Sequence, residues 1–128
     1  MNVNLGRIEQ VAIPVRDLAR ATAFYRDLLG MKLLFEVPPQ LAFFDCDGIR
    51  LALSISSDPM YDPPGSIVYY RVDDIEATHA ELESRGVEFL QGPHRIAELG
   101  DVEIWMAFFE DTEGNTLALT SEKPARKA

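Results

Sequence analysis

The sequence predicts an α+β fold made of paired βαβββ modules, because two separate stretches of the chain recur in the same order. Val15-Arg16-Asp17-Leu18 returns as Val72-Asp73-Asp74-Ile75, and each copy opens an amphipathic segment typical of a helix. Phe43-Phe44-Asp45 returns as Phe108-Phe109-Glu110, and each copy precedes a turn and a second strand-like run. The proline-rich stretch 58–65 lies between the copies and is typical of a linker. This order indicates that one structural unit has been duplicated.

Each expected helix carries a start signal and a stop signal. Asp17 and Asp74 stand where an N-cap carboxylate accepts the first free amides of a helix. Gly30 and Gly86 stand where the left-handed residue after a helix belongs. The elements expected in the first module, with the same order repeated from Ile67, are strand 8–15, helix 18–29 and strands 32–37, 41–46 and 49–56.

The domain boundaries follow from this repeat. We expect one domain, 1–122, with modules 7–57 and 66–121 joined by the linker 58–65, because each module alone is too small to bury its sheet. The short basic stretch 123–128 is expected to be a disordered tail. Val15 and Val72 are 57 positions apart, whereas Ala52 and Ala118 are 66 apart, so nine extra residues lie in the second module, between 90 and 108.

Composition narrows the class of partner. Of the 128 residues, 47% are hydrophobic and 26% are charged, which is typical of a globular domain. The formal net charge is -9, and this argues against a nucleic-acid partner, because binding to phosphates needs a basic face. The balance is compatible with a neutral or cationic small molecule.

Targeting and redox signals are few. The first ten residues are polar and lack the apolar core of a signal peptide, and no apolar run approaches the roughly 20 residues that span a bilayer. Cys46 is the single cysteine, so an internal disulfide is excluded. We therefore expect a cytoplasmic protein with neither a membrane nor a nucleic acid as partner.

Two longer motifs carry a family resemblance. The stretch 24–31 reads FYRDLLGM and the stretch 110–115 reads EDTEGN. With the repeated helix starts, they resemble the vicinal oxygen chelate superfamily, which includes glyoxalase I, bleomycin-resistance proteins and extradiol dioxygenases. The similarity covers about residues 7–121. It implies that the paired modules form a curled mixed sheet, that this sheet encloses a cup for the substrate, and that the protein is a homodimer.

The resemblance also implies where a metal would bind. In this superfamily His and Glu side chains from four strands hold a divalent metal, and the matching positions here are Gln10, Ala52, Ile67 and Ala118. Alanine and isoleucine have no donor atom, and a glutamine oxygen alone is a weak ligand. We therefore expect no metal and no cofactor, and the usual metal-dependent chemistry of the superfamily is disfavoured. A relocated site that joins His94 to Glu103 or Glu110 is the alternative.

Strand alternation extends these positions into a candidate binding surface. We expect Phe43 opposite Ala52, and Ala107 close to Ala118, which would place Trp105 and Phe109 inside the cup. The candidate ligand-binding residues are Gln10, Phe43, Arg50, Ala52, Ile67, Tyr69, Trp105 and Ala118. Such an apolar surface with a few polar groups is typical of a small-molecule site. The alternative is that the aromatic side chains fill the hollow as core.

Three polar residues complete the candidate site. His94, in the region of the extra residues, could orient a ligand or act as a catalytic base, or it could be a hydrogen-bonded histidine at a sheet edge. Arg50 and Arg71 could meet an anionic group, or they could pair with Asp45 and Asp73.

The favoured function is binding of a small molecule without a metal, as the bleomycin-resistance branch of the resemblance implies. One alternative is a metal-independent isomerase or lyase that uses His94. The other is a regulatory or partner-binding module in which side chains close the cup. The remaining expected partner is a second copy of the chain.

Overall fold

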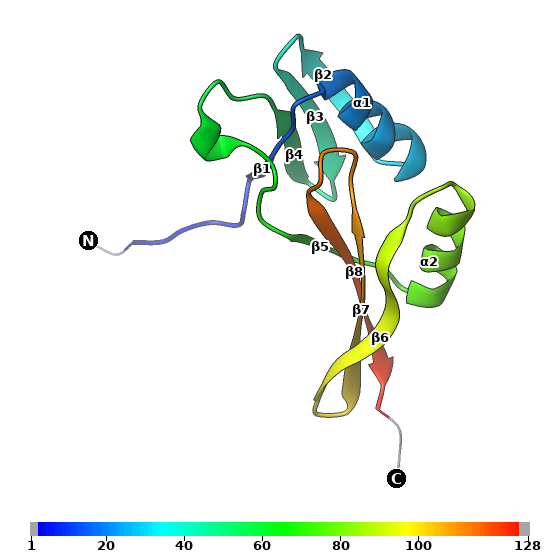
Figure 1. The fold of residues 1–128 in the computed structure, drawn as a ribbon. Helices are drawn as coiled ribbons and strands as arrows, with labels where there is room; N and C mark the ends of the chain where they lie inside the picture. The colour runs from blue at the N-terminus through cyan, green and yellow to red at the C-terminus, as the bar shows by residue number, and fades with distance from the viewer. Residues whose placement is uncertain (1–2, 126–128) are drawn as a thin grey trace. The chain divides into compact units, whose positions relative to one another are not determined.

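A computed structural model describes residues 3–125 as two compact units (Figure 1). The N-terminal unit ends at Pro63 and the C-terminal unit begins at Pro64. The boundary falls inside the predicted linker, where a short 3-10 helix, η2 (Pro59–Tyr61), is capped by Asp58. That the two modules form one domain remains a prediction.

The N-terminal unit has the predicted βαβββ order. Its elements are β1 (Gln10–Pro14), α1 (Leu18–Ala23), the π-helical turn η1 (Phe24–Leu28), β2 (Lys32–Val37), β3 (Leu41–Cys46) and β4 (Ile49–Ser54). The strands form a four-stranded sheet in the order β1-β4-β3-β2. β1 runs parallel to β4, and the other neighbours are antiparallel.

The C-terminal unit repeats this arrangement. Its elements are β5 (Val68–Arg71), α2 (Ile75–Ser84), β6 (Phe89–Leu99), β7 (Val102–Glu110) and β8 (Thr116–Pro124). The sheet order is β5-β8-β7-β6, with β5 parallel to β8. The predicted fold class of paired βαβββ modules is therefore confirmed. Within residues 3–125, neither helix is long and apolar enough to cross a membrane.

The predicted helix signals are present in both units. The carboxylates of Asp17 and Asp74 each accept a hydrogen bond of 3.0 Å, from the backbone amides of Arg20 and Ala77. Gly30 and Gly86 follow the helices with φ of 73° and 93°, a left-handed conformation that costs glycine little. Local capping thus fixes where each helix begins and ends.

One face of each sheet carries its helix and forms the core. In the N-terminal unit the ring of Tyr25 lies 6.0 Å from that of Phe44, and both side chains are fully buried. In the C-terminal unit His79 of α2 contacts Phe89, and Phe89 contacts the buried Phe109. Residues that alternate with Phe44 and Phe109 therefore lie on the opposite side of each sheet. We call that side the helix-free face.

The nine extra residues lengthen the hairpin of β6 and β7, whose turn lies between Leu99 and Val102. One boundary differs from the prediction. β8 continues to Pro124, past the expected end at 122, because Lys123 pairs with Glu103 and Pro124 pairs with Val102 on the longer β7. The expected disorder is thus wrong for 123–125, and 126–128 lie outside the described residues.

The turn between β7 and β8 explains the EDTEGN motif. The buried Asp111 carboxylate accepts hydrogen bonds from the amides of Glu113 (2.8 Å) and Asn115 (2.9 Å) and from Asn115 Nδ2 (2.9 Å). Asn115 Oδ1 accepts a further bond of 2.7 Å from the amide of Gly65. Gly114 completes the turn with φ of 81°. The motif is therefore a structural turn that also holds the start of its own unit.

Candidate functional site

The strand register defines the helix-free face of each sheet. Phe43 pairs with Ala52 in the N-terminal unit, as predicted. In the C-terminal unit Ala118 pairs with Phe108. Paired residues on neighbouring antiparallel strands point to the same side, so both helix-free faces contain a phenylalanine opposite an alanine.

The predicted pairing of Ala107 with Ala118 is therefore wrong by one position. The five-residue turn 111–115 pairs Glu110 with Thr116, and this carries Ala107 to Leu119. A shift of one residue moves every side chain of a strand to the other face. Trp105 and Phe109 thus lie on the face that carries α2, and Phe108 takes the place that was expected for them.

The N-terminal helix-free face combines an aromatic pair with a polar pair. Phe43 stacks on Phe35 of β2, with ring centroids 4.6 Å apart and planes 27° from parallel. Phe35 is still 52% exposed, so one side of this pair is open. Next to them along β4, Arg50 Nε donates a hydrogen bond of 3.0 Å to Gln10 Oε1. Sequence reasoning missed Phe35, because a bulge in β2 after Leu33 sets its direction.

The Gln10–Arg50 bond resolves one open alternative. Arg50 is bonded through Nε to Gln10, not to Asp45, although Asp45 is its cross-strand neighbour. Both side chains are exposed, and the fork of a guanidinium has further donors. The pair therefore presents polar hydrogen-bonding groups beside the aromatic surface.

The C-terminal helix-free face places an aromatic pair beside a histidine. The rings of Tyr69 and Phe108 meet edge to face, with centroids 6.3 Å apart. On the β6 side of Phe108, the centroid of the His94 ring lies 6.2 Å from that of Phe108. Tyr69 pairs with the buried Ala118, and Ile67 precedes β5 and is 45% exposed. The predicted Tyr69, Ala118 and His94 are thus neighbours on one face.

The hydrogen bond of His94 fixes its tautomer. His94 Nδ1 lies 2.7 Å from the backbone oxygen of Gly92. A carbonyl oxygen can only accept, so Nδ1 of the neutral ring carries the hydrogen and Nε2 keeps its lone pair. The ring is half-buried and sits where the ladder of β6 is irregular, between Gln91 and His94. Its free nitrogen is therefore the basic one.

The relocated metal site is not assembled around His94. His94 pairs with Met106, whereas Glu103 lies on the opposite face of β7. Glu110 shares the face of His94 but lies four residues along β7 from Met106, a distance of about 13 Å at the rise of a strand. Within residues 3–125, no group of three or more His, Cys, Asp or Glu side chains is placed to hold a metal ion.

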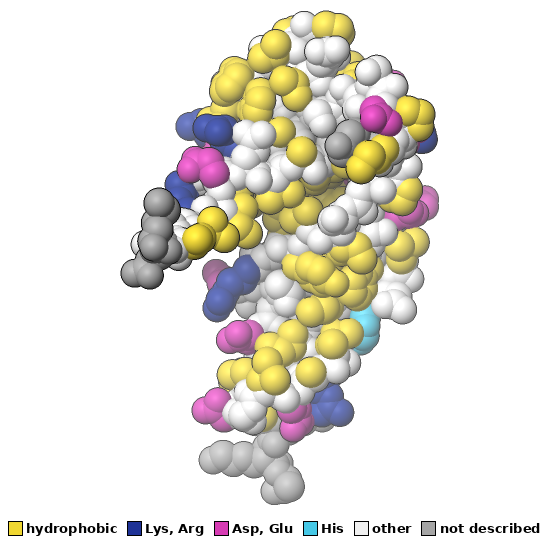
Figure 2. All heavy atoms as spheres, turned by 90° about the vertical axis from the view of Figure 1, so that its left-hand side faces the viewer, with side chains coloured by type: hydrophobic (Ala, Val, Ile, Leu, Met, Phe, Trp, Pro, Cys, Tyr) yellow, Lys and Arg dark blue, Asp and Glu magenta, His cyan; other side chains and the backbone are white. Residues whose placement is uncertain are grey.

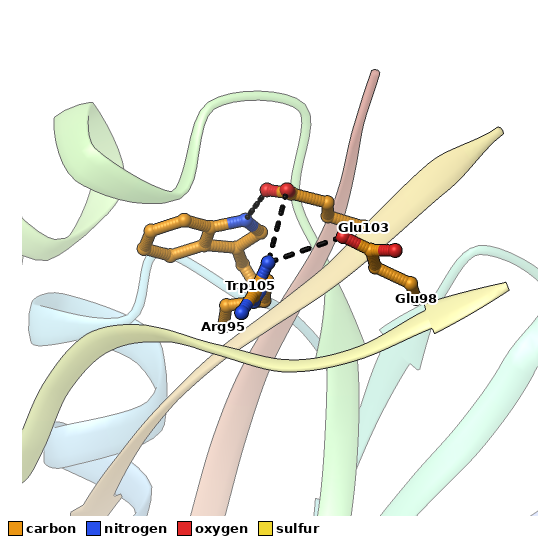
Figure 3. A network of polar contacts seen from close by, with 4 residues as sticks. All are labelled: Arg95, Glu98, Glu103 and Trp105. Atoms are coloured by element: carbon orange, nitrogen blue, oxygen red, sulfur yellow. Dashed lines mark hydrogen bonds and ion pairs between the residues drawn. The ribbon is translucent and has the colours of Figure 1, made fainter. Parts of the chain in front are cut away.

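Trp105 belongs to a polar network on the helix-bearing face (Figure 3). Its indole Nε1 donates to Glu103 Oε1 at 2.9 Å, and the Glu103 carboxylate lies 3.5 Å from the Arg95 guanidinium. Arg95 also meets Glu98 at 3.1 Å, and the ammonium of Lys123 lies 3.9 Å above the Trp105 ring. Glu103 is only 3% exposed. Sequence reasoning did not identify Glu103 as the partner of the indole N–H.

Burial and neighbouring charges shift the pKa values of three side chains in the N-terminal unit. Burial raises the pKa of the Cys46 thiol, and the neighbouring Asp45 and Asp47 raise it further. The hydrogen bond from Arg26 lowers the pKa of Asp27, and the same contact raises the pKa of Arg26. A thiol with a raised pKa is a poor nucleophile near neutral pH, so the surroundings of Cys46 disfavour nucleophilic chemistry there.

Paired βαβββ units with an aromatic helix-free face define a class of small two-module α+β proteins. The family profile described as "Glyoxalase/Bleomycin resistance protein/Dioxygenase superfamily" matches residues 7–119. The chain therefore belongs to this superfamily.

Individual relatives are more distant. A "Glyoxylase-like domain-containing protein" from Didymella fabae is 29% identical over 128 residues, covering 89% of this chain and 92% of the relative. The crystal structure of TnmS3, an antibiotic binding protein from Streptomyces sp. CB03234, matches with a TM-score of 0.73 and 26% identity, covering 95% of this chain and 100% of TnmS3. Lactoylglutathione lyase from Agrobacterium tumefaciens shares the fold with a TM-score of 0.74, at 22% identity and with coverage of 91% and 94%.

Proposed function

We propose that this protein binds a small organic molecule with an aromatic or apolar surface, and that it does so without a resident metal. The observation that carries the proposal is the stacked Phe35–Phe43 pair, which remains half open on a sheet face that carries no helix. Offset stacking and edge contacts of aromatic rings contribute about 0.5–1.5 kcal/mol each beyond the area that they bury. An open stacked pair is thus a suitable surface for a flat ligand.

The donor set supports the metal-free part of the proposal. Ala52, Ala118 and Ile67 have no donor atoms, and the oxygen of Gln10 accepts from Arg50. A divalent metal of the kind used in this superfamily needs three or four nitrogen, oxygen or sulfur donors. The residues present therefore do not fit the metal of the superfamily, and no step of the proposed function passes through one.

The Gln10–Arg50 pair could orient a ligand in the proposed site. Arg50 and Gln10 lie beside the aromatic surface and can donate to oxygen atoms on the edge of a ligand. TnmS3, which has the same fold, is an antibiotic binding protein, and this supports a binding role for the present chain. We therefore expect a ligand that joins a flat apolar body to hydrogen-bond acceptors.

A thermal-shift screen in EDTA tests this proposal, with glycopeptide antibiotics, glutathione adducts and CoA thioesters as probes. A ligand at 100 times its dissociation constant stabilises the protein by about 2.7 kcal/mol. Phe35→Ala should weaken a hit by about five- to tenfold, the equivalent of one ring contact. Met60→Ala is the matched control, because Met60 is a highly exposed apolar residue of the same unit in η2. Binding that requires added metal, or equal affinity in both variants, would contradict the proposal.

A specific observation favours a second candidate, a metal-independent isomerase or lyase. The Nδ1 bond to Gly92 leaves His94 Nε2 as a base on the helix-free face. Turnover in EDTA should then fall at least about 100-fold in His94→Gln, whereas His79→Gln, which removes the other histidine, should leave it unchanged. Turnover that survives in His94→Gln would exclude this role.

We also propose that the protein forms a homodimer, on the basis of the family resemblance alone. Sedimentation velocity at micromolar concentration should give a species of twice the chain mass. A sedimenting species of 14.3 kDa would contradict the dimer.

A further inference from the structure

A cavity of about 510 Å³ lies within the N-terminal unit, where α1 begins. Its walls come from the start of the helix, from the turn after β2, and from Ile55 just after β4. All of its lining residues belong to this one unit. A volume of this size lies within the range of about 300–1,000 Å³ that is typical of small-molecule sites.

The cavity lies on the opposite side of the sheet from the proposed ligand surface. Glu36, which lines it, pairs with Ala42. Ala42 is next to Phe43 on β3 and therefore points to the other face, the one that carries α1 and the buried Phe44. The two surfaces share no residue, so a ligand in this cavity would not contact Phe35 or Phe43.

The lining has apolar walls and acidic edges. Leu18, Ile55 and the prolines 38 and 39 supply apolar surface, and Asp17 and Glu36 supply two carboxylates. The cation among the lining residues is Arg16, whose guanidinium lies 3.7 Å from the Asp62 carboxylate. The charge of Arg16 is thus already offset by a neighbour, so the balance at the cavity favours a cation.

One buried hydroxyl in the wall lacks a partner. Thr22 lines the cavity and is 3% exposed, and its Oγ1 has no hydrogen-bond partner within the part of the chain that the structure describes. Buried hydroxyl groups in folded proteins are nearly always hydrogen-bonded. The oxygen itself is enclosed in the wall, so a rotation of the Thr22 side chain about χ1 is needed to turn it toward the cavity. A polar atom of a bound molecule would then supply the missing bond, independently of the charges.

We infer that this cavity is a second binding site, for a small molecule that carries one cationic nitrogen on an apolar body. The nitrogen lies toward Glu36, and the apolar body packs against the proline turn and Ile55. The Thr22 hydroxyl exchanges a hydrogen bond with the ligand. This function goes beyond the proposed function and does not depend on it.

Three indole compounds of similar size test the charge and shape together. Tryptamine is the cationic probe, tryptophol is the neutral one, and indole-3-acetate is the anionic one. In a ¹⁵N NMR titration at neutral pH and low salt, tryptamine should give saturable shifts of the backbone amides of Leu18, Thr22 and Ile55. Tryptophol should bind more weakly, and indole-3-acetate should leave the chemical shifts of these amides unchanged.

Variants separate this site from general charge effects. Glu36→Gln should weaken tryptamine about threefold, as expected for one exposed ion pair, whereas Glu9→Gln, an exposed glutamate of the same unit outside the cavity, should not. Ala19→Phe should abolish the shifts, because Ala19 lines the cavity and a ring there fills it. Thr22→Val keeps the shape of the wall and should also weaken binding.

Several results would overturn the inference. These are shifts that do not saturate, equal binding of tryptamine and indole-3-acetate, or equal effects of Glu36→Gln and Glu9→Gln. Undiminished shifts in an Ala19→Phe protein whose circular dichroism matches the wild type would overturn it as well.

Discussion

Glu103 is a buried carboxylate whose removal should cost stability in a measurable way. In Glu103→Ala the Trp105 indole N–H loses its acceptor at 2.9 Å. A hydrogen bond to a charged acceptor contributes about 1.5–3 kcal/mol. The loss of the ion pair with Arg95 at 3.5 Å adds little to this cost, because the Arg95 side chain is 55% exposed and retains its ion pair with Glu98 at 3.1 Å. We therefore expect Glu103→Ala to lower the free energy of unfolding by about 2–3 kcal/mol.

Two further variants separate the hydrogen bond from the charge. Glu103→Gln keeps an acceptor for the indole and should cost less than about 1 kcal/mol, because the lost ion pair with Arg95 is partly screened by solvent. Glu98→Gln removes the exposed partner of Arg95 and should change stability by less than about 0.5 kcal/mol. We therefore predict that the loss of unfolding free energy is largest in Glu103→Ala, smaller in Glu103→Gln and smallest in Glu98→Gln.

Urea unfolding followed by tryptophan fluorescence measures these losses directly. Trp105 is the only tryptophan of the chain, so its emission follows the unit that carries the change. Equal midpoints for the wild type and Glu103→Ala would refute the reasoning. So would equal losses in Glu103→Ala and Glu103→Gln, because the charge and not the hydrogen bond would then dominate.

Three further predictions concern turns and the thiol. Gly48→Ala should destabilise the protein by about 1–2 kcal/mol in thermal unfolding, because Gly48 has φ of +90°. Gly6→Ala is the control and should be neutral, because a methyl group there would enter open space. Equal melting temperatures for the two variants would contradict this prediction. Cys46 should react with iodoacetamide more slowly than free cysteine at pH 8, because burial and adjacent carboxylates raise its thiol pKa and leave less thiolate. Asp47→Asn should speed that reaction, and an unchanged rate would show that burial alone acts. Asp111→Ala should cost about 3 kcal/mol, because two backbone amides and one side-chain amide lose a charged acceptor; a loss below about 1 kcal/mol in urea unfolding would contradict it.

Local chemistry made much of the fold predictable. The carboxylates of Asp17 and Asp74 cap their helices as expected, since an N-cap acts within three residues of its own position. Asp47 and Gly48 both have positive φ, as a two-residue hairpin requires. The pairing of Phe43 with Ala52 followed, because a tight turn leaves only one register.

The site was less predictable, because its faces depend on turns and bulges. The turn 111–115 is longer than a tight hairpin, and a count through it was wrong by one residue, which placed Trp105 on the wrong face. β6 changes register three times along β7, so alternation alone could not locate its side chains. Applying the internal repeat would have avoided this error. Phe43 and Phe108 open equivalent stretches, so the pairing of Phe43 with Ala52 implies a pairing of Phe108 with Ala118, in place of the Ala107 that we expected.

Figure 2 shows hydrophobic side chains exposed on the face in view, with charged side chains mostly toward its edges. The exposed large apolar residues include Phe35, Val37 and Tyr69, which register places on the helix-free faces or beside them. Exposed apolar groups of this kind mark interaction surfaces when they are contiguous. Within the N-terminal unit, Phe35 and Val37 are two such residues on the same strand, β2.

Both units carry an alanine at the position where the family resemblance implies a metal-binding glutamate. Ala52 lies opposite Phe43, and Ala118 lies opposite Phe108, each on its helix-free face. Both alanines are almost fully buried, so a carboxylate at either position would have to displace its neighbours and desolvate a charge. A metal would have to compensate that cost. An alanine beside an aromatic ring incurs none of it and leaves the ring free to stack, as the proposed metal-free binding requires.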